Sequence, residues 1–256
     1  MTAAEFKIQF LIFYDKVAGS SAPPYEDSEI ESFLNKAQLQ YIKSHYDFKK
    51  NRSKEGVEET EKRRKDLAEL IRNANPTVSQ SQSGVNPNGS FYDLPSDLMY
   101  TLKEEVSITS DDDCINNKRI PVKPVTHDEY NAYIYNPFKK PDDSLVWRMD
   151  FSADQSVIVT TTTTTNSLGI SIPSVTVSSG AGTKRHELIT DGTYKISQYH
   201  LRYIKTPKEI SITNNITSEL NSNIHEEIVD IAVRMATAIT SPSEYQIKAA
   251  EQQFSE

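Results

Sequence analysis

Two segments near the end of the chain decide the predicted fold. The first reads Tyr199-His-Leu-Arg-Tyr-Ile-Lys-Thr-Pro-Lys-Glu-Ile210, and the second, beyond a polar link, reads Ile224-His-Glu-Glu-Ile-Val-Asp-Ile-Ala-Val-Arg-Met-Ala236. The first predicts a strand of aromatic and polar residues that ends at a proline. The second predicts a helix that is apolar on more than one side, and such a helix needs more covering surface than a small core provides. Together they indicate a component of an assembly and not an enzyme.

The closing helix is predicted over residues 222–240 and stops at Ser241-Pro242. In the strand predicted over 193–204, aromatic and polar residues alternate, so we expect both faces of that strand to be contacted. The helix has two apolar stripes at helical spacing. They are Ile224, Ile228, Ile231, Met235 and Ile239 in one, and Val229, Val233, Ala236 and Thr240 in the other.

The first 75 residues read as three helices. The first is interrupted at 19–24, and a second begins at Asp27 or Ser28, where Glu31 has the spacing of a capping box with Ser28. A third is predicted from Val57 to Asn73. Because its apolar face is wide, we expect the first helix to be enclosed on two sides. That face holds Phe6, Phe10, Phe13, Tyr14 and Val17, widened by Ile8, Leu11 and Ile12; the stripe of the second helix is Ile30, Phe33, Leu34, Ala37, Tyr41 and Ile42.

Beyond a loop at 74–90, rich in Ser, Asn and Gly, the pattern changes to short strands. Thr126-His-Asp-Glu129 fits a capping box and predicts a short helix over 127–133. Asp191-Gly192 is the signal of a two-residue hairpin. The six threonines Thr160–Thr165 favour an extended chain, and with 166–182 they predict an exposed hairpin or insertion. The predicted strands are Leu98–Ile108, Arg119–Val125, Leu145–Phe151, Ser156–Thr164, Glu187–Thr190, Thr193–Ile204 and Glu209–Thr213.

These patterns predict an α+β fold in which a helical bundle carries an inserted antiparallel β region. The N-terminal helices and the C-terminal helix make the bundle. The predicted domains are an N-terminal helical region at 1–75, the inserted β region at 91–213, the returning helix at 222–240 and a tail at 241–256.

Composition narrows the class of protein. The 256 residues are 36% hydrophobic with a mean hydropathy of −0.58, a formal charge of −8 and a pI of about 5.3, which argues against nucleic-acid binding by the chain as a whole. Cys114 is the single cysteine, so no intrachain disulfide is possible. The first ten residues lack the features of a signal peptide, and no apolar run reaches the length of a membrane span. We therefore expect a chain made in a cytoplasm, with no membrane partner.

No group of residues predicts a catalytic, cofactor or metal site. His127-Asp128-Glu129 points in different directions on a helix, and the run from Asp111 to Cys114 lacks the Gly and distal Glu of a calcium loop. His225-Glu226-Glu227 lies in the first turn of a helix, where carboxylates favour the dipole. The basic run Lys62-Arg-Arg-Lys65, with Lys49, Lys50, Arg52 and Lys54 nearby, could touch phosphates. Its interleaved acids favour a solvated, salt-bridged helix.

Several ordered segments resemble one family. The first set is Phe6-Lys-Ile-Gln-Phe-Leu-Ile-Phe-Tyr-Asp-Lys16, Ala22-Pro-Pro-Tyr-Glu-Asp-Ser-Glu-Ile30, Phe33-Leu-Asn-Lys-Ala-Gln38 and Thr60-Glu-Lys-Arg-Arg-Lys65. Then follow Val122-Lys-Pro-Val-Thr-His-Asp-Glu-Tyr130, Asn136-Pro-Phe-Lys-Lys-Pro141, Trp147-Arg148, Glu187-Leu-Ile189, Leu201-Arg-Tyr-Ile-Lys205, Pro207 and His225-Glu-Glu-Ile-Val229. In this order they resemble the head-to-tail connector ring proteins of crAss-like and related tailed phages that infect Bacteroidales.

The resemblance implies a virion structural protein with a helical bundle and a β layer. It implies a homo-oligomeric ring of twelve copies below the portal, with the portal protein and further connector or tail rings as partners. It also implies passing contact with the genomic double-stranded DNA in the channel. The Thr160–Thr165 tract carries no family role and is expected to contact an adjacent ring or the capsid. The alternatives are another capsid- or tail-associated virion protein, or a DNA-binding packaging module that uses the 49–65 region.

Overall fold

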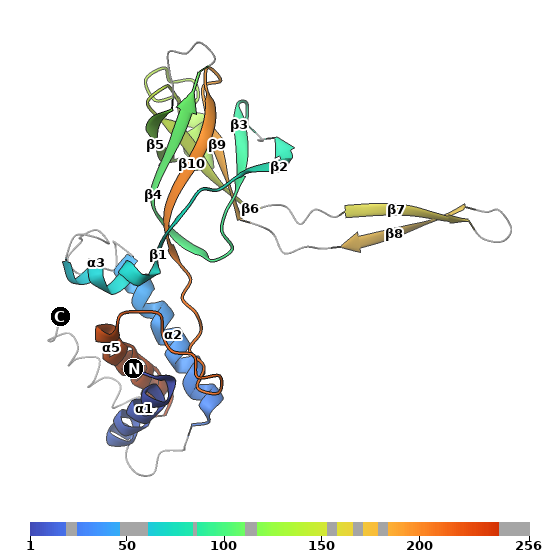
Figure 1. The fold of residues 1–256 in the computed structure, drawn as a ribbon. Helices are drawn as coiled ribbons and strands as arrows, with labels where there is room; N and C mark the ends of the chain where they lie inside the picture. Colours follow the sequence, from blue (N-terminus) through green and yellow to red (C-terminus); the bar gives the residue numbers. More distant parts are fainter. Residues whose placement is uncertain are drawn as a thin grey trace. The chain divides into compact units, whose positions relative to one another are not determined.

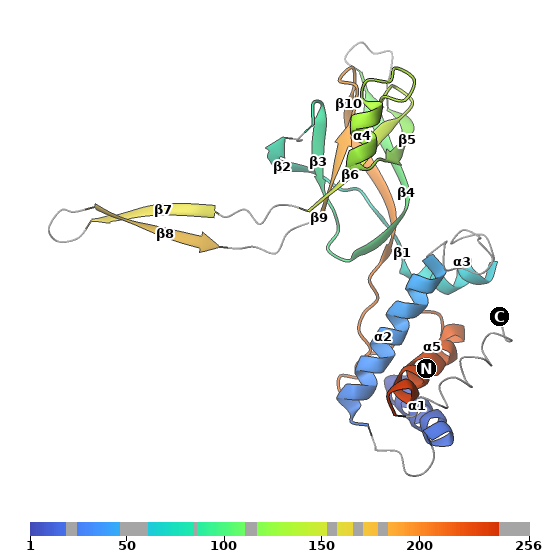
Figure 2. The same cartoon turned by 180° about the vertical axis from the view of Figure 1, so that it is seen from behind.

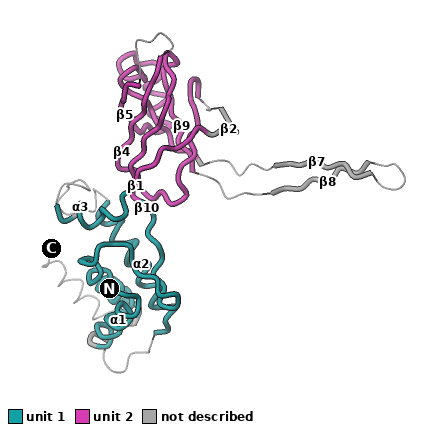
Figure 3. The backbone as a smooth tube through the Cα atoms, viewed as in Figure 1, with its two compact units in different colours: residues 1–71, 205–256 teal, residues 72–204 magenta. Residues whose placement is uncertain are grey.

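The chain forms two compact units, one made of residues 1–71 and 205–256 and the other of residues 72–204 (Figure 3). The computed structural model describes residues 1–18, 25–46, 61–83, 86–110, 117–152, 158–165, 171–178 and 184–240. We refer to the two parts as the helical unit and the sheet unit, and each is described by itself.

The helical unit is built around its last helix. Both α1 and α2 pack against α5, which is therefore covered on two sides, as its two apolar stripes predict. The exception is Ile239, whose side chain is 70% exposed. The elements of this unit are α1 (Ala3–Ala18), α2 (Asp27–Tyr46), α3 (Glu61–Leu67), η1 (Ala68–Leu70), η2 (Ser222–Ile224) and α5 (His225–Thr240).

Helix α1 buries one face and exposes the other. Phe6, Phe10 and Tyr14 are buried at a spacing of four residues, which is the expected stripe. Ile8 and Ile12, however, are 56% and 46% exposed. The predicted enclosure of α1 on two sides is therefore wrong within a single chain, because the helical unit supplies a partner for one face only.

One eight-stranded sheet forms most of the sheet unit, in the order β1-β10-β4-β5-β6-β9-β3-β2, and curls around a core (Figure 1). Strands β5 and β6 run parallel, with Val122 opposite Val146, and β9 is antiparallel to both β6 and β3. The strands are β1 (Ile71–Ala74), β2 (Val78–Ser83), β3 (Gly89–Asp93), β4 (Leu98–Thr109), β5 (Lys118–Pro124), β6 (Val146–Ser152), β9 (Lys184–Ile189) and β10 (Lys195–Lys205).

A short helix, α4 (His127–Tyr133), lies against one part of this sheet (Figure 2). Thr126 accepts a hydrogen bond from the N–H of Glu129, and the Glu129 carboxylate accepts one from the N–H of Thr126, so the predicted capping box is confirmed. Tyr130, Tyr133 and Ile134 then pack on a small core. That core consists of Val125, Trp147, Met149 and Ile189.

The threonine tract is extended, as predicted. Strand β7 (Ile158–Thr165) pairs antiparallel with β8 (Ser171–Ser178) through eight residue pairs, from Ile158 opposite Ser178 to Thr165 opposite Ser171. These two strands form a separate two-stranded sheet.

The predicted fold class, a helical bundle with an inserted antiparallel β region, is wrong. The sheet dominates the fold, and its β5–β6 pair is parallel. Three of its strands lie where none was expected: β1 replaces the end of the helix predicted to reach Asn73, β2 lies within the predicted loop at 74–90, and β3 begins inside that loop. All three are short, and β1 and β2 are also polar, so they lack the apolar alternation that reveals a strand in a sequence.

Two local predictions also fail. The chain does turn at Asp191-Gly192, where Gly192 has a φ of 88°, but β9 lies between β6 and β3 while β10 lies between β1 and β4. The two strands are therefore not a hairpin, because each finds partners elsewhere in the sheet. The strand predicted at Glu209–Thr213 is reduced to one isolated bridge between Ser211 and Ile216.

The two-sided burial of α5 gives a matched pair of substitutions. Ile228 is fully buried, whereas Ile239 on the same helix is 70% exposed. We expect Ile228→Ala to lower the free energy of unfolding by about 2–5 kcal/mol, because it leaves a cavity in the core. Ile239→Ala should change it by less than about 0.5 kcal/mol. Equal losses in urea denaturation would contradict the burial of α5 between α1 and α2.

Candidate functional site

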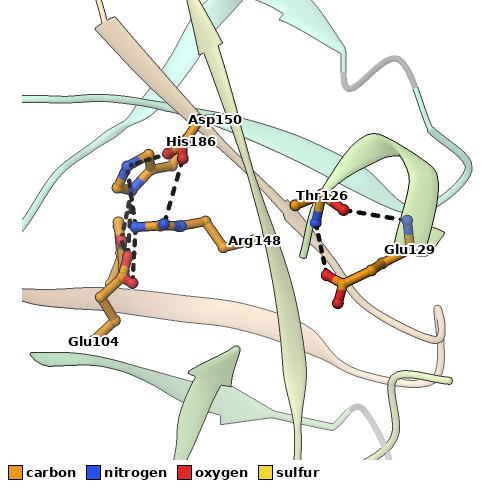
Figure 4. Close-up of polar contacts among 7 residues, drawn as sticks. Glu104, Thr126, Glu129, Arg148, Asp150 and His186 are labelled. Carbon is orange, nitrogen blue, oxygen red and sulfur yellow. Dashed lines mark hydrogen bonds and ion pairs between the residues drawn. The ribbon is translucent and has the colours of Figure 1, made fainter. Parts of the chain in front are cut away.

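A cluster of charged and polar side chains, most of them buried, joins strands of the sheet unit (Figure 4). The cluster, called here the acid–base cluster, joins Glu104 of β4, Arg148 and Asp150 of β6, His186 of β9 and Tyr199 of β10. Arg148 Nη1 lies 2.9 Å from Glu104 Oε2, and His186 Nε2 lies 3.1 Å from Asp150 Oδ1. The Tyr199 hydroxyl donates to Glu104 and lies 2.8 Å from His186 Nδ1.

The cluster favours the charged forms of Glu104, Asp150 and His186. Burial alone would raise the pKa of Glu104, but the hydrogen bond with His186, the charge of Arg148 and the Tyr199 hydroxyl together lower it. Burial also opposes a charged His186, yet its bonds with Asp150 and Glu104 raise its pKa above the ordinary value. A protonated His186 can donate from both ring nitrogens, toward Tyr199 on one side and Asp150 on the other.

Most side chains of the cluster are shielded from solvent. The side chains of Glu104 and His186 are 6% and 3% exposed, and Tyr199 is fully buried, while Asp150 lies at the surface. Because β4 is separated from β6 by β5, the Glu104–Arg148 pair links strands that share no backbone pairing. The arrangement therefore fastens four strands around the core. Among the described residues, no group of three or more His, Cys, Asp or Glu side chains is placed to hold a metal ion.

A second buried carboxylate anchors the start of β3. Glu187 of β9 is fully buried, and its two oxygens accept hydrogen bonds from the backbone N–H and the side-chain amide of Asn86, both at 2.8 Å. A Cβ atom on Gly89 would lie 2.4 Å from Glu187 Oε1. Glycine at 89 is therefore what allows the Asn86 turn to close over this carboxylate.

In the helical unit, one face of α2 holds the connection between β10 and α5. Glu31, Asn35 and Gln38 lie at i, i+4 and i+7 and bind atoms of residues 208–218, called here the strap. Asn35 accepts from the N–H of Ile210 at 2.7 Å and donates to the carbonyl of the same residue at 3.0 Å. This two-way bond imitates the pairing of neighbouring strands.

Each of the three side chains binds a different part of the strap. Gln38 donates to the carbonyl of Lys208 at 2.9 Å and accepts from the Ser218 hydroxyl at 2.5 Å. Glu31 Oε1 accepts from the N–H groups of Ile212 and Thr213, at 2.6 and 3.1 Å. The predicted capping box between Ser28 and Glu31 is therefore wrong, because Glu31 turns to the strap. The N–H of Thr213 contributes most to lowering the pKa of Glu31, against the opposing effect of burial.

The sequence segments considered for metal binding have structural roles in the described part of the chain. His127 is exposed and packs edge-on against Phe151, and Glu129 completes the cap of α4. His225 is buried, and its Nε2 lies 2.9 Å from the carbonyl of Leu220. The run from Asp111 to Cys114 lies outside the described residues.

The basic run is partly neutralised within the helical unit. Lys62 pairs with Glu227 at 3.0 Å, and Lys65 pairs with Glu61 at 2.8 Å as predicted for an i, i+4 salt-bridged helix. The other basic residues considered with it, at 49–54, lie outside the described residues.

The residues of the acid–base cluster and the strap were not singled out from the sequence as functional. Glu104, Arg148 and His186 are each a charged or titratable residue within an otherwise strand-like segment, and such residues are usually solvent-facing. What brings them together is strand order across the sheet, which local sequence does not encode. The local signal in the sequence is Glu104, which takes an alternating position between Leu102 and Val106 in its predicted strand.

Comparison with known proteins covers both compact units. Residues 1–248 match the model of a family described as phage tail ring protein 3/4. The chain is 27% identical over 256 residues to "Ring protein 4/5" of Bacteroides phage crAss001, with 93% of each chain covered. It is 23% identical over 251 residues to "Ring protein 3" of the same phage, with 92% of this chain and 95% of that protein covered.

Removing one hydroxyl tests the acid–base cluster. We expect Tyr199→Phe to lower the free energy of unfolding by about 1–3 kcal/mol, because Glu104 and His186 both lose a buried partner. Tyr92→Phe is the matched control: Tyr92 packs edge-on against Tyr199, and its hydroxyl makes no hydrogen bond to a described residue. The control should change stability by less than about 0.5 kcal/mol. Indistinguishable losses in thermal and urea unfolding would contradict a special role for the cluster.

The strap gives a prediction about pH. Because the folded state lowers the pKa of Glu31, its contribution to stability is present above the ordinary value of 4.5 and is lost as pH falls through the folded-state value. Glu31→Gln should therefore cost about 1–2 kcal/mol at neutral pH, and the difference from the wild type should shrink in acid. The measurement is urea unfolding across a pH series. Glu209→Gln, which replaces an exposed carboxylate within the strap itself, is the control and should show no such dependence.

Proposed function

The chain belongs to the phage tail ring protein 3/4 family, and from this membership we propose that it forms one ring of the head-to-tail connector. The family is one of structural phage ring proteins, so the chain is a virion component with a tail- or connector-associated role. This confirms the resemblance to ring proteins of crAss-like phages. The match over residues 1–248 is the observation that carries the proposal.

In the proposed assembly, twelve copies form a homo-oligomeric ring below the portal, and the ring lines the channel through which the genome passes. Subunits of a closed ring meet through heterologous contacts, in which one face of a copy meets a different face of the next. The net charge of −8 supports a wall that does not retain DNA. We place assembly of the ring in the host cytoplasm. Among the helices of the described residues, none is long and apolar enough to cross a membrane.

We further propose that the chain is not an enzyme. The support is the acid–base cluster: its Glu104, His186 and Tyr199 bind one another and are closed off from solvent. Such a cluster fixes the order of strands instead of meeting a substrate.

The β7–β8 sheet is proposed to contact an adjacent ring or the capsid. Its strands pair with each other along eight residues, and a two-stranded sheet by itself is marginally stable in water. A neighbouring subunit that pairs with or covers these strands would stabilise them. In this proposal, the Thr160–Thr165 tract contributes to contacts with neighbouring proteins of the virion.

The experiment is mass determination by light scattering, with the purified chain alone and mixed with the portal protein of its phage. We expect the mixture to form a large complex of fixed stoichiometry, with twelve copies of this chain per portal ring. A chain that never joins the portal protein would contradict the position below the portal and favour another capsid or tail position. Salt-dependent affinity of the isolated chain for duplex DNA would instead favour the packaging module.

A further inference from the structure

An exposed aromatic loop follows α4 in the sheet unit. The loop, defined here as residues 134–140, is held by its own backbone bonds. The N–H groups of Lys139 and Lys140 donate to the carbonyl of Asn136 at 3.1 and 3.0 Å, and the N–H of Phe138 donates to the Asn136 side chain at 3.0 Å. At its start, Ile134 packs on the small core beneath α4. The loop therefore has a defined shape.

The loop presents two aromatic rings to solvent. Tyr135 is 91% exposed and Phe138 is 96% exposed, the highest values among the large hydrophobic side chains of the described residues. Single apolar residues at a surface need no explanation, but two aromatic rings three residues apart on a braced loop form a patch. Tyr and Phe are enriched at protein–protein interfaces and depleted elsewhere on surfaces.

The rings are accompanied by positive charge. Lys139 Nζ lies 4.1 Å from the ring centre of Tyr133, and Lys123 lies 5.8 Å from the same centre. Lys140 is exposed beside Phe138. Within the described part of the chain, Lys139 and Lys140 form no ion pair, so a partner with carboxylates next to an apolar surface would complement this loop.

The chain carries such a surface itself, on α1. Glu5, Ile8, Ile12 and Asp15 lie at i, i+3, i+7 and i+10, which places them on one face of the helix. All four are exposed, and this face is opposite the buried stripe of Phe6, Phe10 and Tyr14. We call this face the acidic isoleucine stripe. The two isoleucines of the stripe are apolar like the two aromatic rings of the loop. The two carboxylates of the stripe are opposite in charge to the lysines of the loop.

We propose that the aromatic loop of one copy docks on the acidic isoleucine stripe of a second copy of this chain. Tyr135 and Phe138 contact Ile8 and Ile12, and Lys139 and Lys140 lie near Glu5 and Asp15. The contact is heterologous, because the two faces differ, and repeating it closes a ring when the rotation between copies allows. The inference rests on the proposed ring function and names one of the contacts between its subunits.

A protein partner fits the loop better than nucleic acid does. Aromatic rings bind nucleic acids by stacking on the bases of single strands, whereas duplex DNA is bound mainly through its phosphates. Asp142 and Asp143 also lie just beyond the loop, after Pro141, and their charges disfavour a phosphate backbone. Loss of affinity for duplex DNA on Lys139→Glu and Lys140→Glu, without any effect on self-association, would assign the loop to DNA and overturn the proposal.

The test uses two double variants that each lose one face. The loop variant carries Tyr135→Ser and Phe138→Ser, and the stripe variant carries Ile8→Ser and Ile12→Ser. In sedimentation velocity, we expect the wild type to assemble with increasing concentration. Each variant alone should need a concentration about tenfold or more higher, because buried aromatic contacts dominate interface energies.

Mixing the two variants gives the decisive result. The loop variant keeps an intact stripe and the stripe variant keeps an intact loop, so an equal mixture should form a species of two chains and nothing larger. Formation of this species also shows that both variants are folded. The control carries Val78→Ser and Ile216→Ser, which replace apolar residues of 50% and 40% exposure outside both faces, and it should assemble like the wild type.

The outcomes separate this contact from the ring itself. If the wild type assembles and both variants assemble equally well, the contact is overturned and the proposed ring stands. If the mixture of variants stays monomeric, the pairing of these two faces is overturned. A wild type that is monomeric at every concentration overturns self-docking, while a complex with the portal protein in light scattering would still support the connector position.

Discussion

The helical unit depends on covering α5 from two sides. Its buried residues cannot be shielded by one neighbouring helix, and the neighbours that cover it, α1 and α2, come from the opposite end of the sequence. This requirement brings the first and last parts of the described chain into one unit. The intervening residues 72–204 must therefore leave this unit and return to it, and they do so through β1 and β10, which are neighbours in the sheet.

Local chemistry predicts the elements well where one short segment carries the whole sequence signal. The buried stripe of α1 and the capping box at Thr126 and Glu129 are of this kind, and both are found as expected. Strands β1, β2 and β3 are too short to show apolar alternation, and they are stabilised as members of a sheet assembled from distant segments. The fold class was wrong for the same reason: the extent of a sheet is a sum of long-range pairings.

The candidate sites depend even more than the fold on contacts between segments that are far apart in the sequence. Glu31 has the spacing of a helix cap, and only the structure shows that it binds backbone N–H groups of a segment 181 residues away. Glu104 and Arg148 meet across a strand that lies between theirs. Burying such charges is costly unless each has partners, and here several partners act on each one. Because a shifted strand would leave these charges unpaired, the cluster favours one strand order over its alternatives.

The way in which α2 holds the strap has a consequence for evolution. Glu31, Asn35 and Gln38 bind mainly main-chain atoms of residues 208–218, and a main chain is nearly the same whatever side chains it carries. The identity of many strap residues is thus uncoupled from the stability of the unit that holds it. Substitutions of the outward side chains of this segment leave these main-chain bonds in place, so the surface of the strap can change without a change in its path.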